Sequence, residues 1–395
     1  MTVSSRRIYL DHNASAPLLP EARAALIDAL EVTGNPSSVH REGRSARALM
    51  AQARSKIARL VGADAEEVVF TSGATEAAVT CLTPDWVLDG QHVRLPRLAV
   101  LDTDHPCLRE GGRFDPEAVT RLPVDRHGIV DMRALTAWLA MGEPGILAFT
   151  AANSETGVLQ PLSEIVSAAH AAGCVVVVDA VQMATRIPLD TRAIGADALI
   201  LSGHKIGAPK GIGAFVLGST ERRPAPLLTG GAQETRQRAG TEALALIAAF
   251  GAAAEAGERS LDRGGHDALT ALRDHCETAL ALVSREVQIV GDDADRLPQT
   301  VSVHHPRLTA ETVQIALDLD GIAVSAGSAC SSGKVGPSHV LEALHRAGAP
   351  IDPQAGAIRV SFGLTTTRAE IDAFLKAYAR LASRVDADNP RENAA

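Results

Sequence analysis

The sequence predicts an α/β fold, in which a large domain holds a mostly parallel sheet covered by helices and a smaller α/β domain follows it. The first observation is that short apolar runs alternate with longer helical patterns between about residues 45 and 220. Continuously apolar strands separated by helices are typical of a parallel sheet buried on both faces. The second observation is the length of 395 residues, which favours a large and a smaller domain over one simple core.

Six apolar runs are the candidate strands of the large domain: residues 68–70, 98–101, 146–149, 175–178, 199–201 and 214–217. Helical patterns lie between them, such as residues 45–61 and 163–172, and Gly173 stops the second of these. Ligands of such sheets bind at the carboxyl ends of the strands. The residues at these ends are therefore site candidates: Thr71, Asp102, Thr150, Asp179 and Ser202.

A second domain is predicted after a long alanine-rich helical segment. That segment covers residues 242–282. The elements expected after it are strands over residues 287–290, 300–303 and 358–362 and a helix over 311–319. The alternation in the last strand places Arg359 and Ser361 on the face opposite its apolar residues.

These patterns also predict where the domains begin and end. We expect a large domain over residues 16–258 and a small C-terminal domain over residues 259–385, which is joined by the N-terminal segment 1–15. The polar tail, residues 386–395, is expected to be disordered.

Composition excludes several classes of protein. Hydrophobic residues make up 46% and charged residues 22% of the chain, as in ordinary soluble globular proteins. The net charge of −9 argues against a nucleic-acid platform, which normally has a basic face. No run approaches the ~20 apolar residues of a membrane helix, and no signal peptide is evident.

The five cysteines are scattered without a Cys-x-x-Cys pair. An odd count without a pairing pattern indicates reduced thiols, so we expect a cytoplasmic protein. Free cysteine is among the most buried residue types. A buried and inert role is therefore expected for all but one of them: Cys81, Cys107, Cys174 and Cys276.

Lys205 and Asp179 together favour a pyridoxal phosphate (PLP) site. Each follows a buried apolar run, and Gln182 lies one turn beyond Asp179. A lysine amine can condense with the aldehyde of PLP, and a carboxylate can keep its pyridine nitrogen protonated. Taken singly, Lys205 could be a surface lysine and Asp179 a residue that caps a strand end. The pair at two strand ends favours the cofactor.

A phosphate could bind at the turn between a strand and a helix over residues 70–76, which has the sequence Phe-Thr-Ser-Gly-Ala-Thr-Glu. Backbone N–H groups at the start of a helix, together with the hydroxyl of Thr75, suit an anion. Ser202 and His204, beside Lys205, are further candidate donors. His105 follows another predicted strand and could stack on a planar cofactor, although a structural role is the more common one for such a histidine. No metal site is expected.

Cys330 differs from the other cysteines in its surroundings. It lies in the segment Ser-Ala-Gly-Ser-Ala-Cys-Ser-Ser-Gly-Lys, residues 325–334, which is too polar and glycine-rich for a packed core. We therefore expect an accessible thiol on a mobile loop. A passive loop cysteine remains an alternative on this observation alone.

These residues give the chain a resemblance to the cysteine desulfurases, PLP-dependent enzymes of fold type I that are related to aminotransferases. The most specific segments are Ser-Gly-His-Lys at 202–205 and Gly-Ser-Ala-Cys at 327–330. Other matching segments follow the order of the family over nearly the whole chain: residues 8–11, 34–40, 70–76, 153–157, 178–182, 230–234, 238–242 and 358–361.

The resemblance implies a role for each candidate residue of the cofactor site. Lys205 would hold PLP, Asp179 would pair with its ring nitrogen, and Gln182 would bond its ring hydroxyl. His105 would stack on the ring and shuttle a proton. The phosphate would be held by a larger set: Ala74, Thr75, Ser202, His204 and, from the neighbouring subunit of a homodimer, Thr241.

The resemblance also implies the reaction, the conversion of L-cysteine to L-alanine. Asn153, beside the cofactor, and Arg359 would grip the substrate carboxylate, which suits the bidentate fork of a guanidinium. Lys205 would take the α-proton. The sulfur would remain on Cys330 as a persulfide, for delivery to an acceptor protein in iron–sulfur cluster assembly or thiolation.

Three other functions stay open at this point. An aminotransferase or a selenocysteine lyase would keep Lys205 and Asp179, but an aminotransferase would not need Cys330. A non-catalytic scaffold protein with a PLP fold would require a decayed site. The chain departs from the usual family pattern at Ala208 and Ala232, where glycine is common, and at Ala77 and Ala78, which replace a more polar pair. None of these departures removes a catalytic group, and we expect them to affect local hydrogen bonds and turnover.

Overall fold

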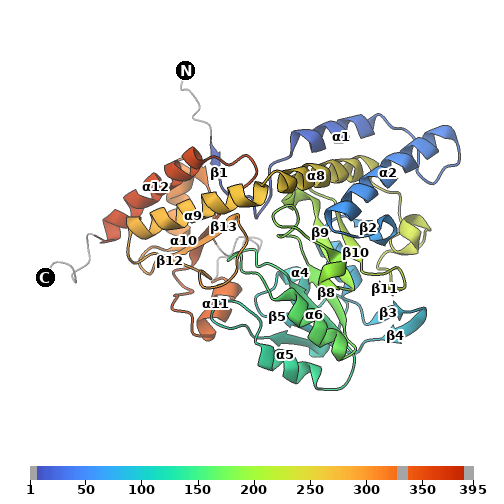
Figure 1. Cartoon of the computed structure of the whole chain (residues 1–395), viewed down its shortest axis with the longest axis horizontal. Helices are drawn as coiled ribbons and strands as arrows, with labels where there is room; N and C mark the ends of the chain where they lie inside the picture. Colours follow the sequence, from blue (N-terminus) through green and yellow to red (C-terminus); the bar gives the residue numbers. More distant parts are fainter. Residues whose placement is uncertain (1–6, 327–336, 387–395) are drawn as a thin grey trace.

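A large and a small sheet organise the protein, as a computed structural model shows (Figure 1). The structure describes residues 7–326 and 337–386. The larger sheet is mostly parallel and is covered by helices, which confirms the predicted α/β class.

The large sheet has seven strands in the order β2-β10-β9-β8-β7-β5-β6. The pairs between β9 and β6 are parallel, whereas β10 is antiparallel to both of its neighbours. All six predicted strands are present, and β6 is an additional edge strand whose exposed Thr120 and Arg121 concealed it. The bounds are β2 (Val68–Thr71), β5 (Leu98–Leu101), β6 (Val119–Leu122), β7 (Ile146–Thr150), β8 (Val175–Asp179), β9 (Ala198–Ser202) and β10 (Gly213–Leu217).

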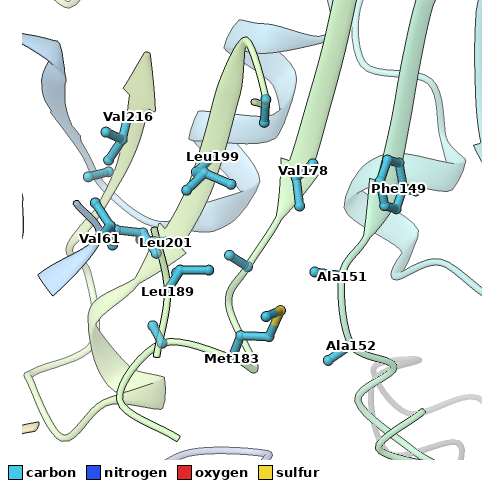
Figure 2. Close-up of a cluster of buried hydrophobic side chains, with 14 of the residues drawn as sticks. Val61, Phe149, Ala151, Ala152, Val178, Met183, Leu189, Leu199, Leu201 and Val216 are labelled. Atoms are coloured by element: carbon cyan, nitrogen blue, oxygen red, sulfur yellow. The ribbon is translucent and has the colours of Figure 1, made fainter. Parts of the chain in front are cut away.

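Successive side chains of the central strands enter two different cores, which is why these strands are apolar throughout. In β8, Val176 and Val178 belong to the core on one face of the sheet, and Val175 and Val177 to the core on the other. Figure 2 shows the first of these cores, with Val178 close to Leu199 of the neighbouring strand β9. The two cores fix the strand ends and therefore the residues that follow them.

Helices cover both faces of this sheet. The helices α1 (Pro20–Leu30), α2 (Arg41–Leu60) and α8 (Leu244–Asp262) pack against one another on one side (Figure 1). The remaining helices of this part are α3 (Ala74–Cys81), α4 (Pro106–Arg109), α5 (Met132–Leu139), α6 (Leu162–Ala171) and α7 (Thr191–Ile194). The helices predicted over residues 45–61 and 163–172 correspond to α2 and α6.

A separate three-stranded sheet was not predicted. It contains β3 (Asp85–Leu88), β4 (Gln91–Arg94) and β11 (Arg222–Pro224). Asp89 and Gly90 join β3 to β4 with φ angles of 52° and 80°. Two left-handed residues of type Asp-Gly are a typical hairpin turn, and this dipeptide was the signal available in the sequence.

The smaller sheet has four strands in the order β12-β13-β16-β15, all antiparallel. Its strands are β12 (Gln288–Ile289), β13 (Thr300–His304), β15 (Ser325–Ala326) and β16 (Ala357–Ser361). It packs with α9 (Gly265–Val283), α10 (Ala310–Leu319) and α12 (Arg368–Asp386), and α11 (His339–Arg346) precedes β16. Ile358 and Val360 enter the core of this part, so the predicted alternation around Arg359 is confirmed.

The N-terminal segment connects the small sheet with the large one. β1 (Ile8–Tyr9) runs parallel to β14 (Ile322–Ala323), and Asp11 forms a bridge with Ser361. The chain then passes the carboxyl ends of the large sheet on its way to α1, as the backbone bond from Ala16 N–H to His204 O shows. The segment predicted to join the small domain thereby also reaches the site.

The structure corrects the helical segment predicted over residues 242–282. It is two helices, because Gly264 has a left-handed φ of 81° between α8 and α9. The predicted domain boundary at residue 258 lies inside α8, and the division into two domains remains a prediction. Asp386, the first residue of the predicted tail, is the last residue of α12; residues 387–395 lie outside the described residues. Within the described ranges, no helix is long and apolar enough to cross a membrane.

Candidate active site

A cavity of about 480 Å³ lies at the carboxyl ends of the central strands. This is the edge of the sheet at which the polar strand ends predicted a site. Most of the predicted site residues line the cavity: Ala74, Thr75, His105, Asn153, Asp179, Gln182, Ser202, His204 and Lys205. Most of the residues predicted for the site therefore lie around one cavity.

Asp179 and Lys205 enter the cavity from neighbouring parallel strands. Asp179 is the last residue of β8, and Lys205 follows the end of β9 at Ser202. The Asp179 carboxylate accepts a hydrogen bond from Val181 N–H at 2.9 Å. Burial raises the pKa of Asp179 to about 6, against the hydrogen bond from Val181 and the charge of Lys205, which lower it. A buried carboxylate thus faces the same space as a lysine amine.

The Lys205 amine is held by the N-terminal segment. Its Nζ donates to the carbonyl oxygens of Asn13 at 2.5 Å and Ala14 at 3.0 Å. The Asn13 carbonyl also accepts from Gln182 Nε2 at 3.1 Å. Sequence reasoning missed these two carbonyls because backbone groups carry no side-chain signal. The Asn13 carbonyl is thus an acceptor shared by Lys205 and Gln182.

His105 is a neutral imidazole with a defined tautomer. It precedes α4, and its Nδ1 accepts a hydrogen bond from Cys107 N–H at 3.2 Å. Burial lowers the pKa of His105 to about 4, and the charges of Lys205 and His339 act in the same direction. With Nδ1 used as an acceptor, the ring proton is on Nε2. His105 can therefore donate a hydrogen bond from Nε2 at neutral pH.

The start of α3 lies at one end of the cavity. Ala74 and Thr75 are its first residues, and the first N–H groups of a helix have no partner within the helix. His204 and Lys210 line the same cavity. Burial, with Lys205 and Lys210, lowers the pKa of His204 to about 4. Lys210 was not predicted as a site residue, and its exposed ammonium adds positive charge there.

Asn153 lines the cavity, yet most of its side chain is engaged by backbone groups. Its Oδ1 accepts from Glu155 N–H at 2.9 Å and Thr156 N–H at 3.0 Å. Its Nδ2 donates to the Thr103 carbonyl at 2.9 Å. Asn153 therefore joins the loop after β7 to the loop that leads to His105, and one Nδ2 hydrogen remains for a ligand.

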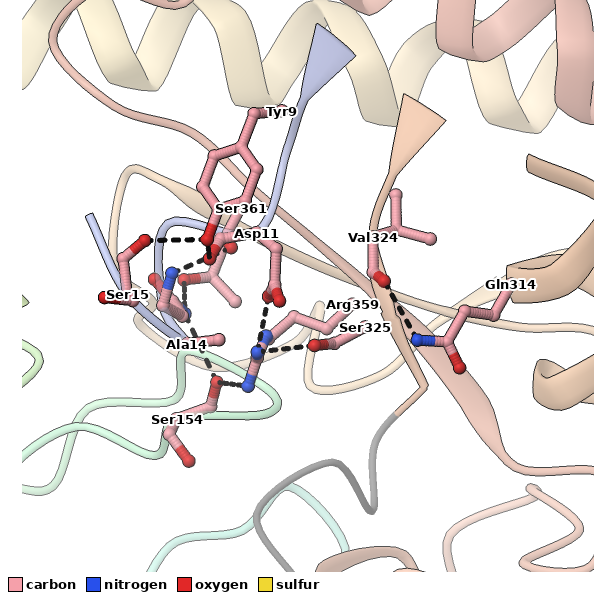
Figure 3. Close-up of polar contacts among 12 residues, drawn as sticks. Tyr9, Asp11, Ala14, Ser15, Ser154, Gln314, Val324, Ser325, Arg359 and Ser361 are labelled. Carbon is pink, nitrogen blue, oxygen red and sulfur yellow. Dashed lines mark hydrogen bonds and ion pairs between the residues drawn. The ribbon is translucent and has the colours of Figure 1, made fainter. Parts of the chain in front are cut away.

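Arg359 lies behind the cavity wall. It is 1% exposed and, among the described residues, it is not part of the lining, whereas Ser154 is. Its Nη1 donates to the Ser154 carbonyl at 3.1 Å, and its Nη2 donates to Asp11 Oδ1 at 2.7 Å and to Ser325 Oγ at 3.0 Å (Figure 3). Arg359, which was predicted to bind the substrate carboxylate, thus contacts the lining residue Ser154 but does not itself line the cavity. It is paired with Asp11.

Like Arg359, the predicted site residue Thr241 is not part of the cavity lining. Thr241 is exposed and lines a neighbouring hollow of about 180 Å³, which shares Ser72, Gly211 and Ile212 with the main cavity. Its contribution to a neighbouring subunit stays a prediction. Cys330 lies outside the described residues, so its predicted role also stays a prediction.

The structure corrects the expectation for Cys107. Cys81, Cys174 and Cys276 are free and buried, as expected. Cys107 lines the cavity beside His105. Burial raises its pKa well above the ordinary value, and the charges of Asp179 and Asp104 add to this. The thiol is therefore protonated at neutral pH and is a poor nucleophile.

One cluster within the described part of the chain has the residue types of a metal site: Glu286, His305 and Asp386. Arg307 already bridges its carboxylates, with donor distances of 2.8 Å to Glu286 and 2.9 Å to Asp386. His305 Nδ1 accepts a hydrogen bond from the backbone N–H of Arg307 at 3.2 Å, so the proton of the neutral ring is on Nε2. An Nε2 that carries a proton offers no lone pair to a metal. The cluster is an ion-pair network.

Comparisons with known proteins agree with this geometry. The model of the aminotransferase class-V family matches residues 8–374. A cysteine desulfurase from Cereibacter sphaeroides is 38% identical and covers 97% of this chain and 98% of its own length. The cysteine desulfurase IscS from Dictyoglomus turgidum is 35% identical over 98% of this chain and 97% of its own. The structure of a NifS-like protein from Rickettsia africae aligns with a TM-score of 0.85 and 29% identity, over 96% of this chain and all of that one.

The chain belongs to the aminotransferase class-V family. The full-length relatives place it, within the family, among the cysteine desulfurases.

Proposed function

We propose that this protein is a PLP-dependent cysteine desulfurase that converts L-cysteine to L-alanine and leaves the sulfur on Cys330. The observation that carries the proposal is the presence of Lys205 and Asp179 in one cavity, on neighbouring strands. The anion-binding start of α3 lines the same cavity. This set of groups fits PLP: an amine for its aldehyde, a buried carboxylate to accept from its ring nitrogen, and backbone N–H groups to donate to its phosphate.

PLP, when bound, supplies an aldehyde that takes up the amine of an amino acid and a ring that accepts electrons from the α-carbon. The residues of the chain do the rest. Asp179 would supply a negative charge to the ring nitrogen, and Gln182 would bond the ring hydroxyl. The phosphate would be held by Ala74, Thr75, Ser202 and His204.

Proton transfer is assigned to two residues. Lys205, once free of the cofactor, takes the α-proton with its Nζ. Its position is fixed beforehand by the carbonyls of Asn13 and Ala14, so the amine has defined acceptors while it is charged. His105 donates from Nε2 to the product side, which its low pKa and fixed tautomer allow.

The sulfur is taken by the Cys330 thiolate, which attacks the sulfur atom of the substrate. The new bond is S–S and the broken bond is that between the substrate sulfur and its β-carbon, whose electron pair remains with the carbon that becomes the methyl group of alanine. Cys107 is disfavoured for this step because its thiol is protonated. The persulfide then passes to an acceptor protein, in iron–sulfur cluster assembly or thiolation.

A homodimer in the cytoplasm is part of the proposal. Thr241 lies on an exposed surface next to the phosphate end of the cavity, where a second copy could receive its hydroxyl. The hollow at Thr241 and the main cavity share Ser72, Gly211 and Ile212, so a partner at one would lie close to the other.

Replacing Asp179 by asparagine is expected to lower alanine formation by about 10²-fold to 10³-fold, the usual loss for one preorganised electrostatic partner. Asparagine keeps an oxygen for Val181 N–H and removes the charge. Steady-state kinetics of the cofactor-loaded variant test this. Asp197→Asn is a poor control because Asp197 holds Arg222 and His170; Asp318→Asn, at an exposed ion pair with Arg7, is the matched one. Equal losses in both variants would contradict the role of Asp179.

The proposed function is tested by the products formed from L-cysteine. We expect alanine without any added 2-oxoacid. Amino transfer that depends on a 2-oxoacid would instead identify an aminotransferase, and activity restricted to L-selenocysteine would identify a selenocysteine lyase. Absence of the visible absorbance of bound PLP after loading would identify a non-catalytic scaffold.

A further inference from the structure

Arg359 is held in a way that does not leave a carboxylate-binding edge open. A guanidinium grips a carboxylate with two parallel N–H groups, taken either from Nη1 and Nη2 or from Nε and Nη2. Both edges need a hydrogen of Nη2. In this protein, Nη2 uses its two hydrogens for Asp11 Oδ1 and Ser325 Oγ. A bidentate grip on a substrate therefore requires one of these partners to leave Nη2.

The remaining donors of Arg359 indicate where an additional ligand could bind. Among the described residues, the buried Nε has no hydrogen-bond partner. Burying an N–H without a partner is costly, more so on a charged group. Nε lies on the same edge as one Nη2 hydrogen, so a carboxylate that replaces the partner of that hydrogen would also satisfy Nε. The guanidinium is thus complete only with an additional acceptor.

Asp11 is the partner whose charge resembles that of the substrate. It contacts Nη2 at 2.7 Å, and Figure 3 shows it on the N-terminal segment, facing Arg359. Its backbone is fixed: Asp11 bridges Ser361, and its carbonyl accepts from the Tyr9 hydroxyl at 3.1 Å. Its side chain is 18% exposed, whereas that of Arg359 is 1% exposed. The carboxylate can thus swing outward while the guanidinium stays in place.

Glu155 is a second acid whose pKa is affected by the charge of Arg359. It accepts the Ser338 hydroxyl at 2.6 Å and is 5% exposed. Burial raises the pKa of Glu155 to about 7, with Ser338 and Arg359 acting in the opposite direction. Glu155 is therefore only partly charged near neutral pH, and Asp11 carries most of the compensation for Arg359.

We propose that Asp11 is a positioning residue that acts as an internal counter-ion, occupying Nη2 of Arg359 in the substrate-free protein and competing there with the carboxylate of the amino-acid substrate. Asp11 keeps the buried guanidinium paired, because an unpaired buried charge destabilises a fold. It also weakens the binding of every ligand that has to displace it. This inference rests on the proposed role of Arg359 in binding the carboxylate.

The test is the affinity of the PLP-loaded Asp11→Asn variant for L-alanine and for L-alaninol, in which a hydroxymethyl group replaces the carboxylate. Asparagine keeps an acceptor for Nη2 but no charge. We expect L-alanine to bind about 10-fold to 100-fold more tightly than to the wild type, the effect of one charged hydrogen bond. L-Alaninol should bind as to the wild type. Isothermal titration calorimetry measures both affinities without turnover.

Thermal unfolding provides a second readout that a merely structural role would not give. Without ligand, the Asp11→Asn variant should melt below the wild type, because Arg359 has lost its counter-ion. With saturating L-alanine, its melting temperature should rise by more than that of the wild type. If Asp11→Asn does not fold, Asp11→Ser carries the same expectation. Asp318→Asn, at the exposed pair with Arg7, controls for the change in net charge and should behave as the wild type.

Two results would overturn different statements. Unchanged or weaker binding of L-alanine by Asp11→Asn, together with weak binding by Arg359→Gln, would overturn the competition and leave Arg359 as the carboxylate anchor. Wild-type affinity of Arg359→Gln for L-alanine would instead overturn the proposed role of Arg359 itself.

Discussion

Alanine formation from L-cysteine is expected to be abolished when Lys205 is replaced by alanine, with a loss of at least about 10³-fold to 10⁴-fold, in the range of a removed general base. Lys205 has two proposed functions, to hold PLP and to take the α-proton. Its Nζ donates hydrogen bonds to the Asn13 and Ala14 carbonyls and lies close to Asp179. Lys210 also follows β9 and lines the cavity, but it is exposed. Alanine quantification over time, with added PLP, is the measurement.

Two controls separate the amine of Lys205 from its charge. Lys205→Arg keeps a cation beside Asp179 but cannot condense with an aldehyde, so it should be as inactive as Lys205→Ala. Lys56→Ala removes a lysine from a surface ion pair with Glu255 and should retain wild-type activity. A Lys205→Ala variant that releases alanine at a substantial rate would contradict the assignment.

The second large effect is expected for Cys330→Ala, which should form no persulfide on the protein and should release alanine about 10²-fold to 10³-fold more slowly, the scale of a lost catalytic group. Without the thiolate, the substrate sulfur has no nucleophile to accept it. PLP binding should remain normal, because the cavity residues are unchanged. Alkylation of the protein after one turnover, followed by mass spectrometry of peptides, measures the persulfide.

Cys107→Ser is the matched variant, because Cys107 is the thiol that the structure places in the cavity. In the Cys107→Ser variant, the persulfide should still form on Cys330. A persulfide found on Cys107 of the wild-type protein, or formation of a persulfide at the wild-type rate in Cys330→Ala, would show that the thiol has been assigned wrongly.

The parts of the site that could be predicted from the sequence are those formed by side chains. Asp179 and Lys205 follow apolar strands, and the parallel order of those strands brings them together, so their juxtaposition could be inferred from local patterns. The face of β16 that carries Arg359 followed from simple alternation. These inferences succeeded because the strand cores fix the ends of the strands.

Contacts between residues far apart in the chain could not be predicted from the sequence. The bond of Lys205 to the Asn13 carbonyl and the ion pair of Arg359 with Asp11 depend on how residues 8–15 cross the sheet ends. No periodicity predicts such a path, because β1 contains only Ile8 and Tyr9 and pairs with an equally short strand. The break at Gly264 was missed for a different reason, since the alanine-rich residues on both sides favour a helix.

The most direct test of the central claim is a single turnover of the PLP-loaded wild-type protein with L-cysteine, in which alanine and protein persulfide are both counted. The account predicts one alanine for each persulfide, with the added sulfur on the peptide that contains Cys330. Alanine without a persulfide on Cys330, or no alanine from protein with bound PLP, would contradict it.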